Sequence, residues 1–190
     1  MLKTKITETK MKREKFLLAI IFLILCAFCF ATTARAANEA EVRGVVQQTF
    51  EQLRGGDYAS LYDRLPSASR RRISRNQFVN QLQRTRNLYE LERLEINSVR
   101  VSGDVAVADT TAYGQIKTPF QGEGKIILRQ YLVREDGEWR VAIEDRAGVQ
   151  RLLASNRDFA RRYPPRQPRF YLKRDGRWID ASQLNTMRRR

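Results

Sequence analysis

The stretch LEINSVRVSGDVAVADTTAYGQIKTPFQGEGKIILRQYLVREDGEWRVAI, residues 94–143, carries the strongest structural signal in this 190-residue chain. Apolar and polar residues alternate along much of it with a period of two, which is typical of β-strands with one buried face. Gly103-Asp104 and Asp136-Gly137 interrupt the alternation, and the second pair is a strong hairpin signal. The alternation slips in phase near Asn97-Ser98, which indicates a β-bulge. We therefore expect a four-stranded antiparallel sheet.

Three helical segments are expected before this sheet. Apolar residues recur at helical spacing after Asn38 until Gly55-Gly56 ends the first helix. Asp57 is the expected N-cap of a short second helix. Ser74, with Gln three residues later, forms a capping-box pattern for a third helix that reaches about Arg86. Helices followed by antiparallel strands predict an α+β fold in which the helices cover one face of the sheet.

The chain continues beyond the sheet with further elements. Residues 146–163 are expected to form an amphipathic C-terminal helix, which the prolines of a short linker at 164–168 terminate. Residues 169–190 are expected to form a small hairpin, turning at Asp175-Gly176, and a basic tail.

Residues 1–36 have the order of an export signal peptide. Basic residues precede the uncharged apolar run Phe16–Phe30, and small residues follow, ending in Ala34-Arg35-Ala36. Signal peptidase cuts after such an ending. The sequence therefore predicts cleavage between Ala36 and Ala37, and a periplasmic or secreted protein.

Two points about this leader stay open. An uncleaved anchor in the inner membrane is the alternative, because Phe16–Ala34 is free of charge and just long enough to span the core of a bilayer. Met11 begins a leader of more usual length than Met1 does. The sequence alone does not decide which methionine is the true start.

Composition excludes several kinds of catalytic and metal site. Both cysteines, Cys26 and Cys29, lie in the leader, and the chain has no histidine. A Ser-His nucleophile, an HExxH zinc helix and imidazole metal sites are therefore excluded. We expect no metal and no cofactor. The leader holds seven of the 36 Lys and Arg and two of the 21 Asp and Glu. This leaves 29 basic and 19 acidic residues and a basic exported protein.

Five segments between residues 42 and 143 share the pattern of a known superfamily. They are Phe50–Tyr58, Leu61–Leu65, Ser67–Ser74 with Gln77–Val79, Gly103–Ala108 and Tyr131–Val141. Together they resemble the NTF2-like (nuclear transport factor 2-like) superfamily, in particular its exported bacterial members, over a domain at residues 37–145. The resemblance implies a curved sheet wrapped around helices, with a conical cavity used for binding or catalysis. It also implies homodimers that form through the outer face of the sheet. No catalytic motif of the superfamily maps onto this sequence.

Three polar residues within the expected strands are candidates for ligand binding: Asp109, Tyr113 and Gln130. An acid beside a phenol in a dry pocket can transfer protons, because desolvation raises the pKa of the carboxyl group towards neutrality. The alternative places Asp109 on the solvent face of its strand. Val105 and Val107 on one face of this strand and Ala106 and Ala108 on the other are all apolar, so the pattern does not decide which face is buried.

Arginines form the densest basic cluster: Arg70, Arg71, Arg72 and Arg75, with two more at 84 and 86. Such a cluster can bind an anionic membrane surface or an anionic envelope polymer through contacts to phosphate. The alternative is a solvated face of a protein that uses Arg for nearly every positive charge. Export makes nucleic acid an unexpected partner.

Two functions therefore remain open. The first is a non-catalytic binding or scaffolding module of the bacterial cell envelope. The second is a small lyase- or isomerase-type enzyme that uses a carboxylate and a Tyr for acid–base chemistry, with Asp109 as the base. We favour the first, because no catalytic motif is present.

Overall fold

The computed structural model describes residues 36–118, 121–143 and 146–181. The chain divides into two compact units, residues 1–38 and 39–190, and the fold below is that of the second. The expected leader lies outside the described residues apart from Ala36, which is helical, as is Ala37 after the expected cleavage point. Within the described ranges, no helix combines the length and the apolar character needed to cross a membrane.

Short-range capping sets the bounds of the helices. A helix over residues 36–55 ends where Gly56 adopts a positive φ of 78°, a conformation that glycine adopts without strain. In α2 (Tyr58–Asp63), the Asp57 side chain accepts a hydrogen bond from the Ser60 amide, as expected. The capping box of Ser74 and Gln77 begins α4 (Arg75–Arg86). The sequence did not predict α3 (Ser67–Arg70), a single turn after Pro66.

All strand pairs of the sheet are antiparallel. The strands are β1 (Tyr89–Ser102), β2 (Val105–Ile116), β3 (Gly122–Glu135), β4 (Glu138–Val141), β5 (Arg169–Arg174) and β6 (Arg177–Asp180). Their order is β1-β2-β3-β5-β6, and β4 also pairs with β3. The described sheet thus has six strands rather than the four expected, because the C-terminal hairpin joins it. β4 occupies one end of the β3 edge, and β5 pairs with residues 124–127 nearer the other end.

Turns and bulges fix the register of the strands. Asp136-Gly137 and Asp175-Gly176 have positive φ at both positions, between 49° and 82°, as a two-residue type I′ hairpin turn requires. The bulge expected near Asn97-Ser98 is present as a register shift between Ile96 and Ser98. A second shift lies between Leu91 and Arg93.

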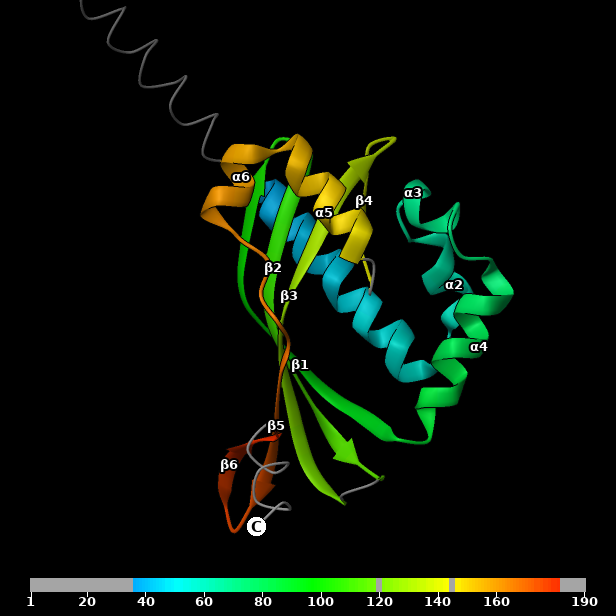
Figure 1. Cartoon of the computed structure of the whole chain (residues 1–190), viewed down its shortest axis with the longest axis vertical. Coiled ribbons are helices and arrows are strands. Elements are labelled where there is room, and N and C mark those ends of the chain that lie inside the picture. The colour runs from blue at the N-terminus through cyan, green and yellow to red at the C-terminus, as the bar shows by residue number, and fades with distance from the viewer. Residues whose placement is uncertain (1–35, 119–120, 144–145, 182–190) are drawn as a thin grey trace, which may run out of the picture. The chain divides into compact units, whose positions relative to one another are not determined.

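Helices cover both faces of the sheet around residues 105–108, and this part of β2 is therefore buried on both sides (Figure 1). On one face, Val42 and Val46 of the first helix pack against Ala106 and Ala108. On the other face, α5 (Arg146–Ser155) and α6 (Arg157–Arg162) place Leu153 and Phe159 against Val105, Val107 and Tyr131. We expected one helix over residues 146–163. It is broken at Asn156, where the backbone leaves helical angles (φ −128°, ψ 61°).

The helices and the curved antiparallel sheet have the α+β arrangement that the resemblance to the NTF2-like superfamily implies (Figure 1). The first helix, α2 and α4 follow one another before the sheet begins. A second core cluster joins α2 to α4 through Leu61, Leu65, Phe78 and Leu82. Leu65, Phe78 and Leu82 of this cluster also line a pocket.

Candidate functional site

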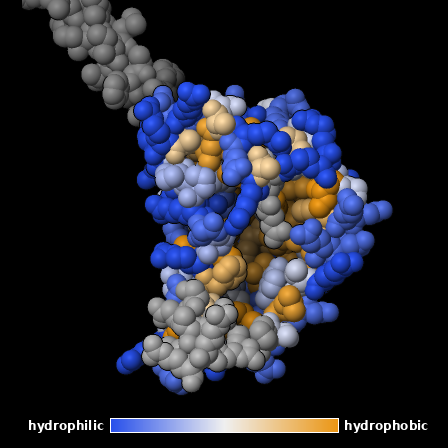
Figure 2. Space-filling view, viewed as in Figure 1, coloured by the Kyte–Doolittle hydropathy of each residue, from blue (hydrophilic) through white to orange (hydrophobic). Residues whose placement is uncertain are grey.

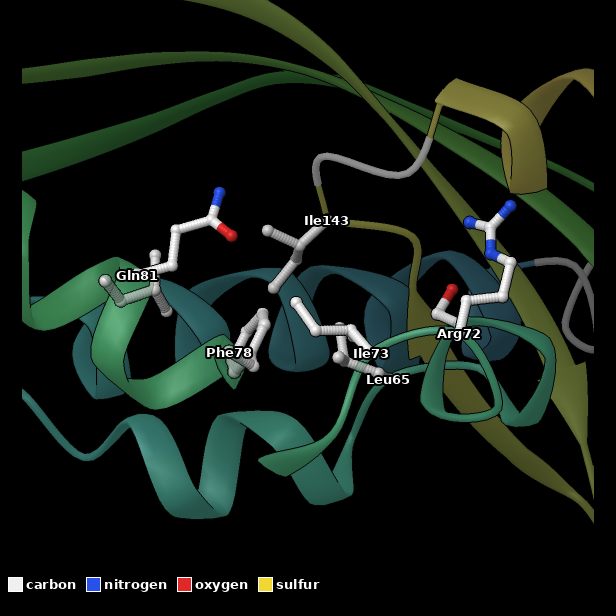
Figure 3. Close-up of a pocket in the computed structure, with 8 residues that line it drawn as sticks. Leu65, Arg72, Ile73, Phe78, Gln81 and Ile143 are labelled. Carbon is white, nitrogen blue, oxygen red and sulfur yellow. The ribbon is translucent and has the colours of Figure 1, made fainter. Parts of the chain in front are cut away.

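An apolar pocket of about 170 Å³ lies beside α4. Its lining residues come from α2 to α4 and from the chain after β4: Leu65, Ser69, Arg72, Ile73, Phe78, Gln81, Leu82 and Ile143. Figure 2 shows the surface hollowed on the side of α2 and α4, with hydrophobic residues around the hollow. In Figure 3 the apolar side chains occupy the middle of the pocket, and Gln81 and Arg72 lie towards its two ends.

Local geometry explains why these side chains converge. Phe78 and Leu82 are four residues apart on α4 and so share one face of the helix. The Tyr62 ring lies 5.8 Å from that of Phe78. Its hydroxyl shares its single proton between the carbonyl oxygens of Arg70 and Ile73, at 3.2 and 3.0 Å. These two bonds hold the α3 turn against α2.

The described residues that line the apolar pocket are suited to binding an apolar group. Phe78 and Leu82 are 7% and 6% exposed, and Ile73 and Ile143 pack beside them. No carboxylate, phenol or amine stands among the described lining residues. These walls can exclude water from an apolar group, and they offer no group suited to proton transfer.

A second hollow, the polar groove, has a volume of about 930 Å³ and is more open. It lies between the first helix, the α2–α3 region and β4. Its lining residues are Glu41, Val45, Gln48, Gln52, Asp57, Ser60, Asp63, Arg64, Arg70, Glu138, Trp139 and Arg140. Most of them are polar or charged, in contrast to the apolar pocket.

Asp109 forms a bidentate ion pair on the face of the sheet that carries α5 and α6. Its two carboxylate oxygens accept from Nε and Nη2 of Arg129, at 2.7 and 2.8 Å. These hydrogen bonds hold the pKa of the Asp109 carboxyl below its ordinary value, although partial burial opposes them. Asp109 lines neither hollow. A base with a lowered pKa accepts protons poorly at neutral pH.

The other two candidate ligand-binding residues lie on opposite faces of the sheet. Tyr113 shares the face of Asp109, four residues along β2, and its hydroxyl donates to Glu95 at 2.9 Å. That hydrogen bond raises the pKa of the Tyr113 phenol. Gln130 pairs with Ala108 and so faces the first helix, where its amide nitrogen donates to Thr110 at 3.2 Å. The structure does not bring the three residues together.

The basic cluster does not act as one uniform surface. Arg75 pairs with Asp63, and its guanidinium lies 5.3 Å from the centre of the Tyr62 ring. Arg72 lines the apolar pocket and Arg70 lines the polar groove. Arg71 is exposed. Arginines adjacent in sequence therefore have different surroundings.

The sequence predicted the helix that carries Phe78 and Leu82 but not the pocket that these residues line. Helical spacing predicts a buried face but not a gap within it, which depends on distant residues such as Ile143. Among the described residues, no three His, Cys, Asp or Glu side chains gather as metal ligands would.

No protein-family model matches the sequence, and no curated protein matches it. Solved structures do resemble it. An NTF2-like protein of unknown function from Pseudomonas putida KT2440 is 16% identical, with a TM-score of 0.41 over 56% of this chain and 83% of that one. An NTF2-like protein with a cystatin-like fold from Novosphingobium aromaticivorans is also 16% identical, with a TM-score of 0.41 over 65% and 94%.

A third structure, from Campylobacter jejuni and provisionally described as an NTF2-like transpeptidase, is 13% identical. Its TM-score is 0.36, over 52% of this chain and 94% of that one. At these identities and TM-scores, the matches say nothing about activity, ligand or partner.

Proposed function

We propose that this chain is an exported, non-catalytic binding module of the bacterial cell envelope. Its apolar pocket would hold the apolar part of a small ligand. The observation that carries the proposal is the wall of Leu65, Ile73, Phe78, Leu82 and Ile143 around about 170 Å³ of space. An apolar cavity of about 150 Å³ in another protein is large enough to take up benzene. A single ring or a short branched chain therefore matches this pocket in size.

A titration with benzene tests this binding. The methyl groups of Ile73, Leu82 and Ile143 line the pocket, so their NMR signals should shift and saturate as benzene is added. The methyl groups of Val105 and Val107, in the core beneath α5 and α6, should not shift. Benzene that leaves the pocket methyl signals unchanged would remove the proposal.

A matched pair of variants assigns the binding to the pocket. Leu82 and Leu153 are both 6% exposed, but only Leu82 lines the pocket. In Leu82→Phe the larger side chain fills the pocket, so this variant should lose the benzene shifts. Leu153→Phe should keep them. Equal loss in both variants would show that the shifts report general loosening of the core.

Export is supported by the signal-peptide order of residues 1–36. A carboxy-terminally tagged chain expressed in a Gram-negative host should appear in the periplasmic fraction, with Ala37 as its first residue by N-terminal sequencing. An intact N-terminus in the cytosolic fraction would contradict export, and an intact N-terminus in the inner membrane would indicate the anchored alternative.

The basic surface is proposed to add attachment to an anionic envelope surface. Replacing Arg70, Arg71 and Arg72 together by Gln should weaken retention on phosphatidylglycerol liposomes at low salt, because exposed charges act over about one Debye length. Arg75 should contribute less, since it is paired with Asp63. Unchanged retention of the triple variant would remove this part of the proposal. No specific observation favours the acid–base enzyme as a second function.

A further inference from the structure

The acidic and basic side chains that line the polar groove differ in whether they pair with other residues of the protein. All four acids in its lining have a partner in the protein. Glu41 pairs with Arg134 at 2.7 Å and Glu138 with Arg140 at 2.9 Å. Asp63 pairs with Arg75, and Asp57 caps α2 through the Ser60 amide.

Two lining arginines differ from these acids. The side chains of Arg64, at the C-cap of α2, and Arg70, the last residue of α3, form no ion pair or side-chain hydrogen bond with any described residue. Both residues are half-buried. Guanidinium groups bind carboxylate and phosphate oxygens through paired N–H donors. The charge that the groove offers to a ligand is therefore positive, although its lining contains four acids.

Some buried polar atoms in the wall of the groove also lack hydrogen-bond partners. Three lining residues carry a buried polar atom without a partner among the described residues: Gln52 Oε1, Trp139 Nε1 and Arg140 Nε. Trp139 is only 3% exposed. Buried polar atoms normally have a partner. These three atoms expose almost no surface, so a ligand in the groove would reach them only after the wall moves, and it would first meet the half-buried Arg64 and Arg70.

We propose that the polar groove binds a small hydrophilic molecule that carries a phosphate or a carboxylate, with the anionic group held by Arg64 and Arg70. The rest of the molecule meets the amide and hydroxyl groups of Gln48, Gln52 and Ser60. A volume of about 930 Å³ lies within the range of small-molecule sites. This size admits a sugar acid or a sugar phosphate. The site is separate from the apolar pocket, and the inference does not depend on the proposed function.

Isothermal titration calorimetry with glucose and two of its anionic derivatives tests the ligand class. Glucose 6-phosphate and glucuronate carry the anionic group and should bind, whereas glucose should not bind measurably. The tighter of the two anions identifies phosphate or carboxylate as the preferred group. Equal binding of glucose, or binding of none of the three, would overturn the inference.

Single substitutions locate the site. Arg64→Gln and Arg70→Gln should each weaken binding of the preferred anion at least tenfold, because each removes a charged donor. Arg71→Gln is the matched control: Arg71 is exposed, adjacent to Arg70 and absent from the lining. It should change the affinity less than twofold. Equal loss in Arg71→Gln and Arg70→Gln would show attraction to a basic surface rather than a built site.

The apolar pocket provides an independent check. Leu82→Phe should leave binding of the anion unchanged, because Leu82 does not line the polar groove. Arg64→Gln should leave the benzene shifts unchanged in turn. Failure of the inference and failure of the proposed function are therefore distinguishable.

Discussion

Arg129 is the most deeply covered of the charged side chains in the described ion pairs, with only 4% of its side chain exposed against 30% for Asp109. Its Nη1 also donates to the carbonyl of Pro164 at 3.0 Å. The nearby Tyr131 hydroxyl donates to the carbonyl of Tyr163 at 2.8 Å. These contacts attach the chain after α6 to the sheet. We interpret the Asp109–Arg129 pair as a structural link rather than as an acid–base group.

Replacing Asp109 by Asn should lower the free energy of unfolding by about 2 kcal/mol at pH 7, because Arg129 loses a charged hydrogen-bond partner. Pairing lowers the folded-state pKa of Asp109 below its ordinary value of 3.8. The contribution of the pair is therefore fully present above this ordinary value and is lost as pH falls through the lowered one. Urea unfolding at several pH values should show a constant difference from pH 7 to 5 and a shrinking one below about pH 4.

The control for this prediction is Asp158→Asn on α6. Asp158 pairs with Arg161, but 74% of its side chain is exposed, and exposed pairs contribute little. A pH-independent loss in Asp109→Asn, or an equal loss in Asp158→Asn, would contradict the account.

At this scale the sequence left Asp109 undecided for a physical reason. Residues 105–108 of β2 are all buried, because helices cover both faces of the sheet there. Alternation identifies the buried face only when the other face is solvated. The partner residue, Arg129, lies on the neighbouring strand, and the pairing register was not part of the prediction.

Among the elements, α4 connects local sequence to the proposed site. Its capping box fixes where the helix begins, and the helix then presents Phe78 and Leu82 to the apolar pocket. The Ser74 hydroxyl accepts from the Gln77 amide at 3.3 Å, and the Gln77 side chain accepts from the Ser74 amide at 3.2 Å.

Ser74→Ala should destabilise the protein by about 1 kcal/mol, because a backbone amide of the first turn loses its partner. It should also weaken benzene binding in the pocket. Thermal unfolding and the NMR titration measure the two effects. Ser155→Ala, at the exposed end of α5, should change neither. A Ser74→Ala variant as stable as the wild type would show that packing alone fixes the start of α4.

Elements with local signals were predicted well, and those fixed by distant contacts were not. The cap of α4, the two Asp-Gly turns and the bulge at Ile96 are confirmed. The pairing of β5 with residues 124–127 depends on contacts between segments more than 40 residues apart. No local pattern reports such contacts. The single turn of α3 and the break at Asn156 likewise follow from packing.

On the scale of the whole molecule, α5 and α6 restrict how the sheet can meet a partner. They cover Val105, Val107 and Tyr131 on one face. We therefore propose that a homodimer through the sheet, which the resemblance implies, uses the part of this face around Tyr113, Lys125 and Trp178. There the Tyr113 and Trp178 rings lie 6.2 Å apart, and the Lys125 ammonium lies 4.5 Å from the centre of the Trp178 ring.

Phe159→Ala should lower the free energy of unfolding by about 3 kcal/mol, because loss of the buried aromatic ring leaves a cavity beneath α6. Phe159 is 4% exposed. Phe170→Ala is the matched control, since Phe170 is 54% exposed and should change stability by no more than about 0.5 kcal/mol. Urea unfolding compares the two variants. Equal effects would mean that α6 does not pack on the sheet as described.

The space between Leu65, Phe78, Leu82 and Ile143 is proposed to bind an apolar group. A crystal structure of the protein under xenon pressure tests this claim most directly, because xenon enters dry apolar cavities and scatters strongly. We predict an ordered xenon atom in contact with Phe78 and Leu82, absent from crystals of Leu82→Phe. Xenon-pressurised crystals with no such atom, or with side chains filling the space, would contradict the claim.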